Sequence, residues 1–280
     1  MSGAAPLEHR PLEPFGAEVN LDLSTPLTPA RAAALRDLFF TRSLLVFRNQ
    51  HLSMDDQKRV VSYVGPVLEP SSGYLSPEDG ILNTAHLDFH SDLCSTPLPF
   101  DAISLHAQDV DEGRTSTRFA SGLRAYALLS EAMKAKVQAL QVNMVQTVAD
   151  KRRLRYDAPA DALSLVRPLV LTHRTTGEPI LYCSESSAAR IEGWPQRESD
   201  ALLAELFSAL YAPTNQYEHV WRNGDLVIWD NLSLQHARDA LPADRPRRLQ
   251  RVVAGLKTLR EQVPGYDLTP VMSEVDRRAT

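Results

Sequence analysis

The sequence predicts one mainly-β domain with peripheral helices, built as a β-sandwich or barrel. From residue 66 onward, short apolar runs alternate with clusters of Pro, Gly, Asp and Ser. Helical patterns interrupt this texture only at about 121–140 and 198–211, and no Pro/Gly/Ser-rich linker separates two cores. We therefore expect a single domain over residues 1–257, with a loose lead-in over 1–11 and a polar tail over 258–280.

The first third of the chain predicts two helices and two strands. A short strand is expected at 18–23. Thr28-Pro29 then fits an N-cap followed by proline at the first helical position, and the apolar run at 43–47 predicts a second strand. Ser53 with Asp56 resembles a capping box that begins a second helix, which should stop at Gly65-Pro66.

The remaining elements are mostly strands. The helix at 198–211 carries its leucines on one face, as a surface helix that covers a core does. The expected strands are 80–82, 100–105, 169–173, 180–183, 220–222, 226–229 and 249–256, and the turn Asn223-Gly224-Asp225 separates two of them.

Composition excludes several classes of protein. The chain has 280 residues, of which 43% are apolar and 23% charged, so it is neither disordered nor fibrous. A net charge of −5 gives no global basic field, which argues against a nucleic-acid partner. Two cysteines cannot build a disulfide framework, and no apolar run is long enough for a membrane span. We expect a cytoplasmic protein without a membrane partner.

His90-Ser91-Asp92 is the sharpest local motif. In a strand, residues two apart point to the same face, so the imidazole and the carboxylate would converge. Such a pair suits a metal that takes nitrogen and oxygen donors. The same motif also occurs in ordinary surface turns, so it does not identify a metal site by itself.

A second candidate follows the strand 226–229. The chain turns at Asp230-Asn231 and returns as a strand that contains His236. A histidine on an apolar face is usually a core residue, but here it would add a third ligand. Two histidines and one carboxylate form the facial triad of non-haem iron(II) oxygenases. Zinc accepts the same ligands, so a zinc hydrolase stays open.

Four arginines gather at 245–251. On a strand, Arg247 and Arg251 share one face with Leu249, while Arg248 takes the other. If the shared face is the core, two guanidinium groups point inward and need an anionic partner. A dicarboxylate could supply one, whereas a solvated edge strand would need none.

Taken together, these motifs resemble the taurine/2,4-dichlorophenoxyacetate dioxygenase family, from about residue 12 to 257. Supporting segments are 43–48, 117–130, 172–177 and 229–231. The resemblance implies a double-stranded β-helix, or jelly roll, with helices outside. It also implies that His90, Asp92 and His236 are the catalytic iron ligands.

The resemblance further implies a site for 2-oxoglutarate. The family places a threonine about two dozen residues after the aspartate and an arginine eleven after the distal histidine. These positions fit Thr117 and Arg247, which would bind the distal carboxylate of the cosubstrate. Thr115 is a rival for Thr117, because the triplet Glu112-Gly113-Arg114 matches only loosely the Gly-rich triplet that normally precedes the threonine.

The resemblance assigns the substrate-binding residues less specifically than the iron and 2-oxoglutarate sites. Arg251 matches an arginine that contacts anionic substrates in some members. His86 and Leu93 are candidate pocket neighbours by position, and Tyr182 is another. The loops 70–85 and 146–166 are candidate lids, and the second contains a basic run at 151–155 that also suits a solvated surface.

The implied activity is that of an iron(II)- and 2-oxoglutarate-dependent dioxygenase. Such an enzyme consumes O₂, releases succinate and CO₂, and most often hydroxylates a C–H bond, here of a small anionic molecule. Desaturation, cyclisation or epimerisation in natural-product biosynthesis are alternatives with the same cofactors. An alternative of another class is a jelly-roll binding protein that holds zinc or no metal. Relatives are often dimers or larger, so a homo-oligomer is also implied.

Overall fold

The computed structural model describes residues 7–69, 72–75, 86–146, 162–240 and 245–265. The expected strand at 80–82, the basic run at 151–155 and most of the two candidate lids lie outside these residues. Within them the chain is mainly β with six α-helices, so the prediction of a mainly-β chain with peripheral helices is confirmed.

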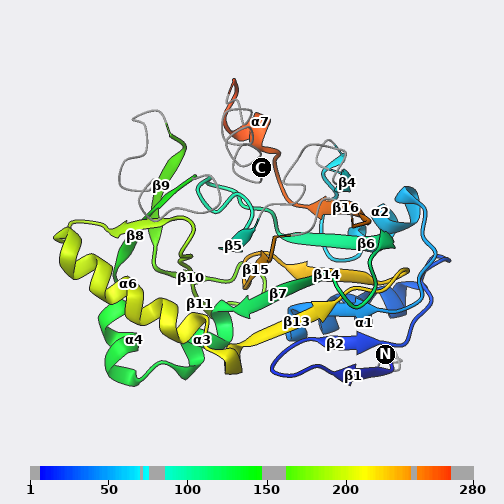
Figure 1. The fold of residues 1–280 in the computed structure, drawn as a ribbon, viewed down its shortest axis with the longest axis horizontal. Coiled ribbons are helices and arrows are strands. Elements are labelled where there is room, and N and C mark those ends of the chain that lie inside the picture. The colour runs from blue at the N-terminus through cyan, green and yellow to red at the C-terminus, as the bar shows by residue number, and fades with distance from the viewer. Residues whose placement is uncertain (1–6, 70–71, 76–85, 147–161, 241–244, 266–280) are drawn as a thin grey trace.

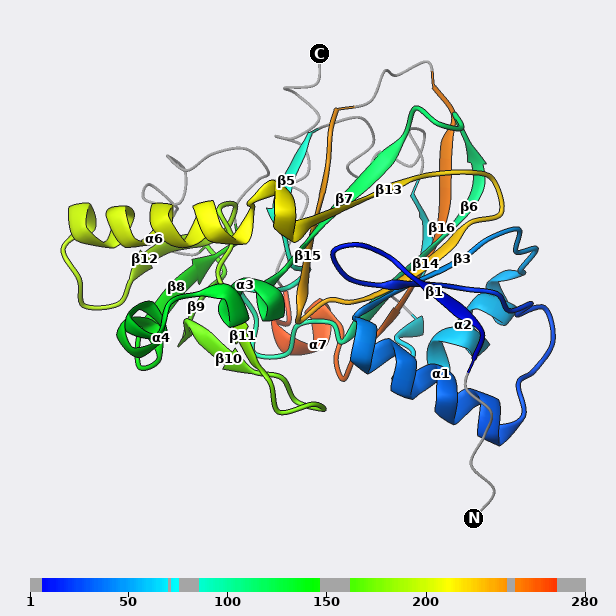
Figure 2. The same cartoon turned by 90° about the horizontal axis from the view of Figure 1, so that it is seen from below.

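Two sheets form the centre of the molecule (Figure 1, Figure 2). The larger has the strand order β1-β2-β3-β14-β6-β16-β4, and the smaller has the order β13-β7-β15-β5. The larger comprises β1 (His9–Pro11), β2 (Ala17–Val19), β3 (Leu44–Phe47), β4 (Gly73–Leu75), β6 (Ala102–Val110), β14 (Leu226–Asp230) and β16 (Arg247–Ala254). The smaller comprises β5 (Leu87–His90), β7 (Ser116–Ser121), β13 (Gln216–Val220) and β15 (Leu234–Arg238).

The inner faces of the two sheets share one apolar core. Phe119 of β7 and Leu234 of β15 belong to the same buried cluster as Trp229 of β14 and Leu249 of β16. Phe119 meets Trp229 edge to face, with ring centroids 5.3 Å apart. Side chains on these inner faces therefore point into the space between the sheets.

Helices α1 (Pro29–Arg42) and α2 (Met54–Ser62) cover the outer face of the larger sheet. Thr28 caps α1 with Pro29 at its start, and Ser53 with Asp56 forms a full capping box on α2, so both predicted starts are confirmed. The second helix ends slightly earlier than predicted, because residues 63–65 form a turn before Pro66.

The remaining elements other than the last helix form a side lobe against the smaller sheet (Figure 1). The predicted helix at 121–140 is two helices, because Ser130 caps a new start. The leucine face predicted near 198–211 is buried in this lobe. The lobe comprises α3 (Gly122–Leu128), α4 (Glu131–Val137), β8 (Gln141–Val145), β9 (Ser164–Pro168), β10 (Val170–Thr172), β11 (Pro179–Leu181), β12 (Ala188–Ile191), α6 (Gln196–Leu210) and the 3-10 turn η3 (Pro213–Asn215).

Both expected end segments contain structure in their described parts. The prediction of a loose lead-in is wrong at residues 9–11, because β1 pairs with β2 and fixes them. In the expected polar tail, Thr258 caps α7 (Leu259–Gln262). Gln262 bonds the backbone of Leu98 through both atoms of its amide, which anchors this helix.

None of the helices in the described ranges combines the length and apolarity that a membrane span requires.

Gly122 tests how tightly the side lobe packs on the smaller sheet. A Cβ at this position would lie 2.8 Å from both Ile180 Cγ2 and the Leu181 carbonyl oxygen. We expect Gly122→Ala to lower the free energy of unfolding by about 1–3 kcal/mol, because the backbone of β11 must move. Chemical denaturation measures the change. Gly73→Ala is the control, since a Cβ there meets nothing within 4 Å. Equal losses in both variants would contradict this packing.

Candidate metal centre

His90 is the last residue of β5, and Asp92 lies in the turn that follows it. The expectation that both residues lie on one strand is therefore wrong. The turn still brings the two side chains together: His90 Nε2 lies 3.3 Å from Asp92 Oδ1. Leu93 has a left-handed backbone with φ of 60°, which bends the chain away directly after the carboxylate.

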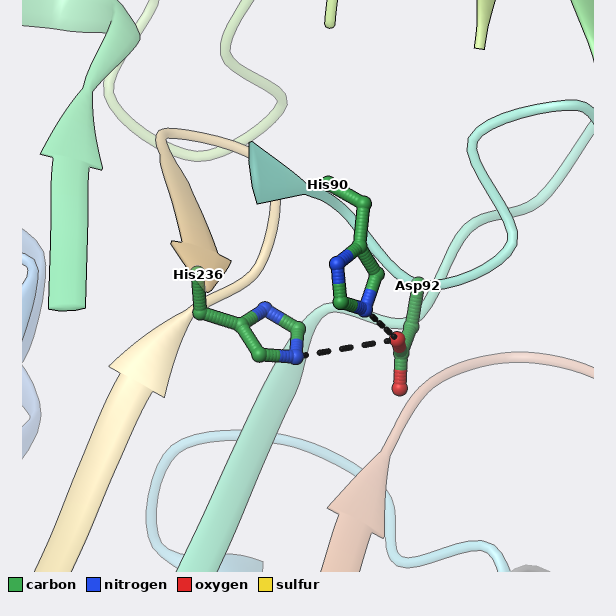
Figure 3. A group of neighbouring side chains, drawn as sticks. All are labelled: His90, Asp92 and His236. Atoms are coloured by element: carbon green, nitrogen blue, oxygen red, sulfur yellow. Dashed lines mark ion pairs between the residues drawn. The ribbon is translucent and has the colours of Figure 1, made fainter. Parts of the chain in front are cut away.

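His236 reaches the same point from the neighbouring strand. β15 pairs antiparallel with β5, and His236 lies directly opposite His90 in the register. The two rings have centroids 4.2 Å apart, and His236 Nε2 lies 3.8 Å from Asp92 Oδ1 (Figure 3). One ligand atom from each of the three residues lies within 4.8 Å of the others. The donor set of two imidazoles and a carboxylate fits a divalent transition metal.

The charge states of Asp92 and His236 suit metal binding. Burial would raise the pKa of Asp92, but the hydrogen bond to His90 and the charge of Arg251 hold that pKa well below its usual range. Burial and the neighbouring charge of His90 lower the pKa of His236 to about 3. Asp92 is therefore ionised and His236 neutral at pH 7, and a metal needs both forms.

His90 is oriented by its other ring nitrogen. Its Nδ1 lies 2.7 Å from the carbonyl oxygen of Asp88 and donates to it, so Nε2 faces Asp92. Burial would lower the pKa of His90, but the hydrogen bond and the charge of Asp92 raise it above the usual value.

Asn231 holds the backbone of Asp92. Its Oδ1 accepts from the Asp92 N–H at 2.9 Å, and its Nδ2 donates to the carbonyl oxygens of Asp92 and Phe100, both at 3.0 Å. The Asn231 side chain is fully buried, so water could not take its place as hydrogen-bond partner of these backbone groups. The Asp230-Asn231 turn thus positions one candidate ligand directly and begins the strand that carries another.

Asp230 fixes this turn. Its two carboxylate oxygens accept from Ser233 Oγ and from the backbone N–H groups of Leu232 and Ser233. His173 Nε2 donates to the same carboxylate at 2.7 Å, and both side chains are buried. A loop of the side lobe therefore braces the start of β15.

Arg251 contacts the second oxygen of Asp92. Its Nη2 donates to Oδ2 at 2.7 Å, while Oδ1 faces the two histidines. The guanidinium also lies over the ring of Phe100, 5.4 Å from its centroid. The sequence left open whether this face of the strand is inward or solvated, and these contacts show that Arg251 faces inward.

Arg247 is the second inward guanidinium of β16. It is 5% exposed, whereas Arg248 is exposed on the other face, as the alternation predicted. Its Nε has no hydrogen-bond partner within the described ranges. Burial and the charge of Arg238 lower the pKa of Arg247 to about 9, so it remains a cation at pH 7. A buried cation of this kind fits an anionic ligand.

Thr117 lies on β7 and Thr115 directly precedes this strand, and both side chains are buried. Thr115 Oγ1 donates to the carbonyl oxygen of Asp111 at 3.4 Å. Thr117 Oγ1 instead accepts from Trp221 Nε1 at 3.0 Å. Asp111 directly follows β6, and its N–H donates to the carbonyl of Pro246, which extends the pairing of β6 with β16 beside Arg247.

The three remaining predicted residues lie in different surroundings. His86 is exposed and bonds Asp88 at 3.0 Å. Leu93 is half-buried against the core between the sheets. Tyr182 is buried in the side lobe and lines a small cavity that has room for about one water molecule. This cavity also touches Ser91 and both free cysteines, so it lies directly behind the His90–Asp92 turn.

Sequence reasoning missed three residues that shape the site. Asn231 and Trp221 act across separations of 139 and 104 residues, for which no local pattern exists. Arg238 is buried beside Arg247, two positions after His236 on the same face of β15. The alternation along β15 would have indicated its inward direction.

Comparison with known proteins adds independent findings. The family model described as taurine catabolism dioxygenase TauD, TfdA family matches residues 8–253, which confirms the resemblance predicted from the motifs. The (S)-phenoxypropionate/alpha-ketoglutarate-dioxygenase of Sphingobium herbicidovorans is 29% identical over 258 residues, which is 84% of this chain and 88% of that protein.

Two further relatives extend this picture. The tyrosine isonitrile desaturase of Pseudomonas aeruginosa is 40% identical over 96 residues, or 30% of this chain and 33% of that protein. The solved structure of AAD-2 in complex with Mn(II) and N-oxalylglycine matches with a TM-score of 0.77 and 25% identity, over 91% of this chain and 99% of that one.

Asn231→Ala tests the clamp on Asp92. Loss of the amide leaves buried backbone groups of Asp92 and Phe100 without partners, which should lower the free energy of unfolding by about 1–3 kcal/mol. The looser carboxylate should weaken Fe(II) binding by about 10- to 100-fold. Anaerobic metal titration and denaturation measure the two effects. Asn20→Ala, at an exposed asparagine bonded to Glu8, is the control. An unchanged metal affinity would exclude this role for Asn231.

Proposed function

This chain belongs to the taurine catabolism dioxygenase TauD, TfdA family, and we propose from that premise that it hydroxylates a C–H bond of a small anionic substrate. It is a non-haem iron(II)- and 2-oxoglutarate-dependent dioxygenase. The observation that carries the proposal is the convergence of His90, Asp92 and His236 at one point.

The three residues would hold iron(II) through His90 Nε2, His236 Nε2 and Asp92 Oδ1. The donor set fits this metal, since two imidazoles and one carboxylate leave positions open for a cosubstrate and O₂. Arg251 holds the other carboxylate oxygen, so Asp92 offers the metal a single oxygen. The Asn231 amide fixes the backbone of Asp92, and the Asp88 carbonyl oxygen orients the ring of His90.

Arg247 and Thr117 would hold the distal carboxylate of 2-oxoglutarate. The fit is supported by a buried cation whose Nε lacks an acceptor within the described ranges. Thr117 suits this role better than Thr115, because the Thr115 hydroxyl already donates to Asp111. A guanidinium and a hydroxyl together supply the charge and the donors that a carboxylate accepts.

When bound, iron and 2-oxoglutarate supply the activation of O₂, with release of succinate and CO₂. The residues of this chain supply position and surroundings. Trp229 packs against His236 with ring centroids 5.0 Å apart, and the core between the sheets shields the site from water on that side. Arg247 keeps the cosubstrate in one orientation, so that its other end meets the three ligands.

An anionic group of the substrate would bind at Arg251. This guanidinium already contacts Asp92, so a substrate bound there would lie beside the metal. We also propose His86 and Leu93 as neighbours of the substrate. Tyr182 would contribute from the side lobe, through the turn that it backs.

Desaturation is the second candidate outcome, with cyclisation and epimerisation as further variants of the same cofactor chemistry. It is favoured by the similarity of one segment to the tyrosine isonitrile desaturase. Product analysis by mass spectrometry separates the outcomes: hydroxylation adds 16 mass units, and desaturation removes two.

We further propose that the two central sheets form a double-stranded β-helix within a single domain. A cytoplasmic location and a homo-oligomeric assembly are proposed with it.

His236→Ala and Asp92→Ala test the ligand assignment. Each variant removes one of three donors, so we expect Fe(II) affinity to fall more than about 100-fold and O₂-dependent succinate release to stop. Metal titration and succinate assays measure these changes. His51→Ala, at an exposed histidine, should change neither. Tight Fe(II) binding together with succinate release in either ligand variant would disprove the assignment of these ligands. Absence of succinate release in the wild type would instead favour a zinc or metal-free binding protein.

Arg247→Gln tests the cosubstrate site. We expect the Kd for 2-oxoglutarate to rise more than about 100-fold, because a buried charge pair is lost. The free energy of unfolding without ligand should stay equal or rise, since the variant removes a buried, uncompensated cation. Calorimetry on Mn(II)-loaded protein and denaturation of the ligand-free form measure these values. Arg248→Gln, on the exposed face of the same strand, is the control. Equal Kd values in both variants would contradict the proposed site.

A further inference from the structure

Trp221 lies in the core between the two sheets, next to the proposed cosubstrate site. Its side chain is fully buried and belongs to the same cluster as Phe119 and Leu249. Its backbone is held at both ends: its N–H bonds the carbonyl of Thr115 at 2.9 Å, and its carbonyl accepts from Gly113 at 3.3 Å. The indole therefore has a fixed direction.

That direction is toward Thr117. Trp221 Nε1 donates to Thr117 Oγ1 at 3.0 Å, and both side chains are buried. An indole N–H can only donate, so the threonine oxygen must be the acceptor in this bond. The hydroxyl hydrogen of Thr117 is thereby left to donate to another group, and the structure gives it no acceptor within the described ranges.

Thr115 provides the contrast on the same face of the same chain segment. Its hydroxyl donates to a backbone carbonyl, so its hydrogen is already used. The two threonines differ in what they can offer a ligand, and the difference arises from Trp221. A hydroxyl that accepts one hydrogen bond also becomes a stronger donor in the next one.

We infer that Trp221 is a positioning residue, which orients the Thr117 hydroxyl as a donor to the distal carboxylate of 2-oxoglutarate. This inference rests on the proposed function, because it assumes that the cosubstrate binds between Thr117 and Arg247. Trp221 does not touch the cosubstrate in this account. It acts only through Thr117, because its hydrogen bond leaves the neutral threonine hydroxyl free to donate to a carboxylate.

Three variants test the inference by calorimetry on anaerobic Mn(II)-loaded protein. Thr117→Val should raise the Kd for 2-oxoglutarate about tenfold, because a donor to a charged group is lost. Trp221→Phe keeps an aromatic ring but removes the N–H, and should raise this Kd about three- to tenfold. In the double variant the tryptophan change should add less than about twofold, since its effect passes through Thr117.

Pyruvate separates positioning from a general structural role. It has the keto acid group of 2-oxoglutarate but no distal carboxylate, so its Kd should be equal in wild type and Trp221→Phe. A repacked core would weaken both ligands alike. In turnover, KM for 2-oxoglutarate should rise while kcat changes less than about twofold. Trp194→Phe is the control, because Trp194 packs in the side lobe.

Wild-type protein gives a test that does not depend on a variant folding. The chain has three tryptophans, so indole-labelled Zn(II)-loaded protein gives three indole N–H signals by nuclear magnetic resonance. The Trp221 signal should shift with 2-oxoglutarate and stay in place with pyruvate, while the Trp194 signal stays in place with both.

The outcomes distinguish this inference from the proposed function. If wild type binds 2-oxoglutarate but Trp221→Phe binds it equally well, the positioning role is wrong and the proposed function stands. Additive effects in the double variant, or equal losses for pyruvate, would also overturn the role. If folded, metal-loaded wild type does not bind 2-oxoglutarate at all, the proposed function itself fails.

Discussion

Residues directly opposite each other on antiparallel strands hold their side chains on one face, about 5 Å apart. His90 and His236 are such a pair, and the register between β5 and β15 is the constraint on which the candidate site depends. A slip of one residue would turn one histidine to the opposite face. Asp92 then needs only the turn after β5, which Asn231 holds from the turn that precedes β15.

Buried charge is the second organising feature. Asp92 is the common neighbour of His90, His236 and Arg251, so one carboxylate balances the positive groups around it. Arg247 has no such balance within the described ranges, although it is nearly as buried as the apolar core. Leaving a cation in this state costs free energy that a bound dicarboxylate would offset. The unbalanced charge of Arg247 therefore makes the site favour an anionic ligand.

Local signals in the sequence predicted those features that neighbours in the chain decide. The caps at Thr28 and Ser53 and the opposite directions of Arg247 and Arg248 are of this kind, because residues a few positions apart determine them. The sequence did not predict that β5 ends at His90, nor that β1 forms within the lead-in. Both depend on pairing with remote strands. The Asn231 clamp and the Trp221–Thr117 bond join residues more than a hundred positions apart, and only the folded chain reveals them.

The most direct test of the central claim is an anaerobic visible spectrum. Metal-free protein receives Fe(II) and then 2-oxoglutarate, and the charge-transfer absorption of an iron-chelated keto acid is followed. The account predicts that this band grows to saturation at one cosubstrate per chain. Folded protein that binds Fe(II) at these three residues but never develops the band would contradict it.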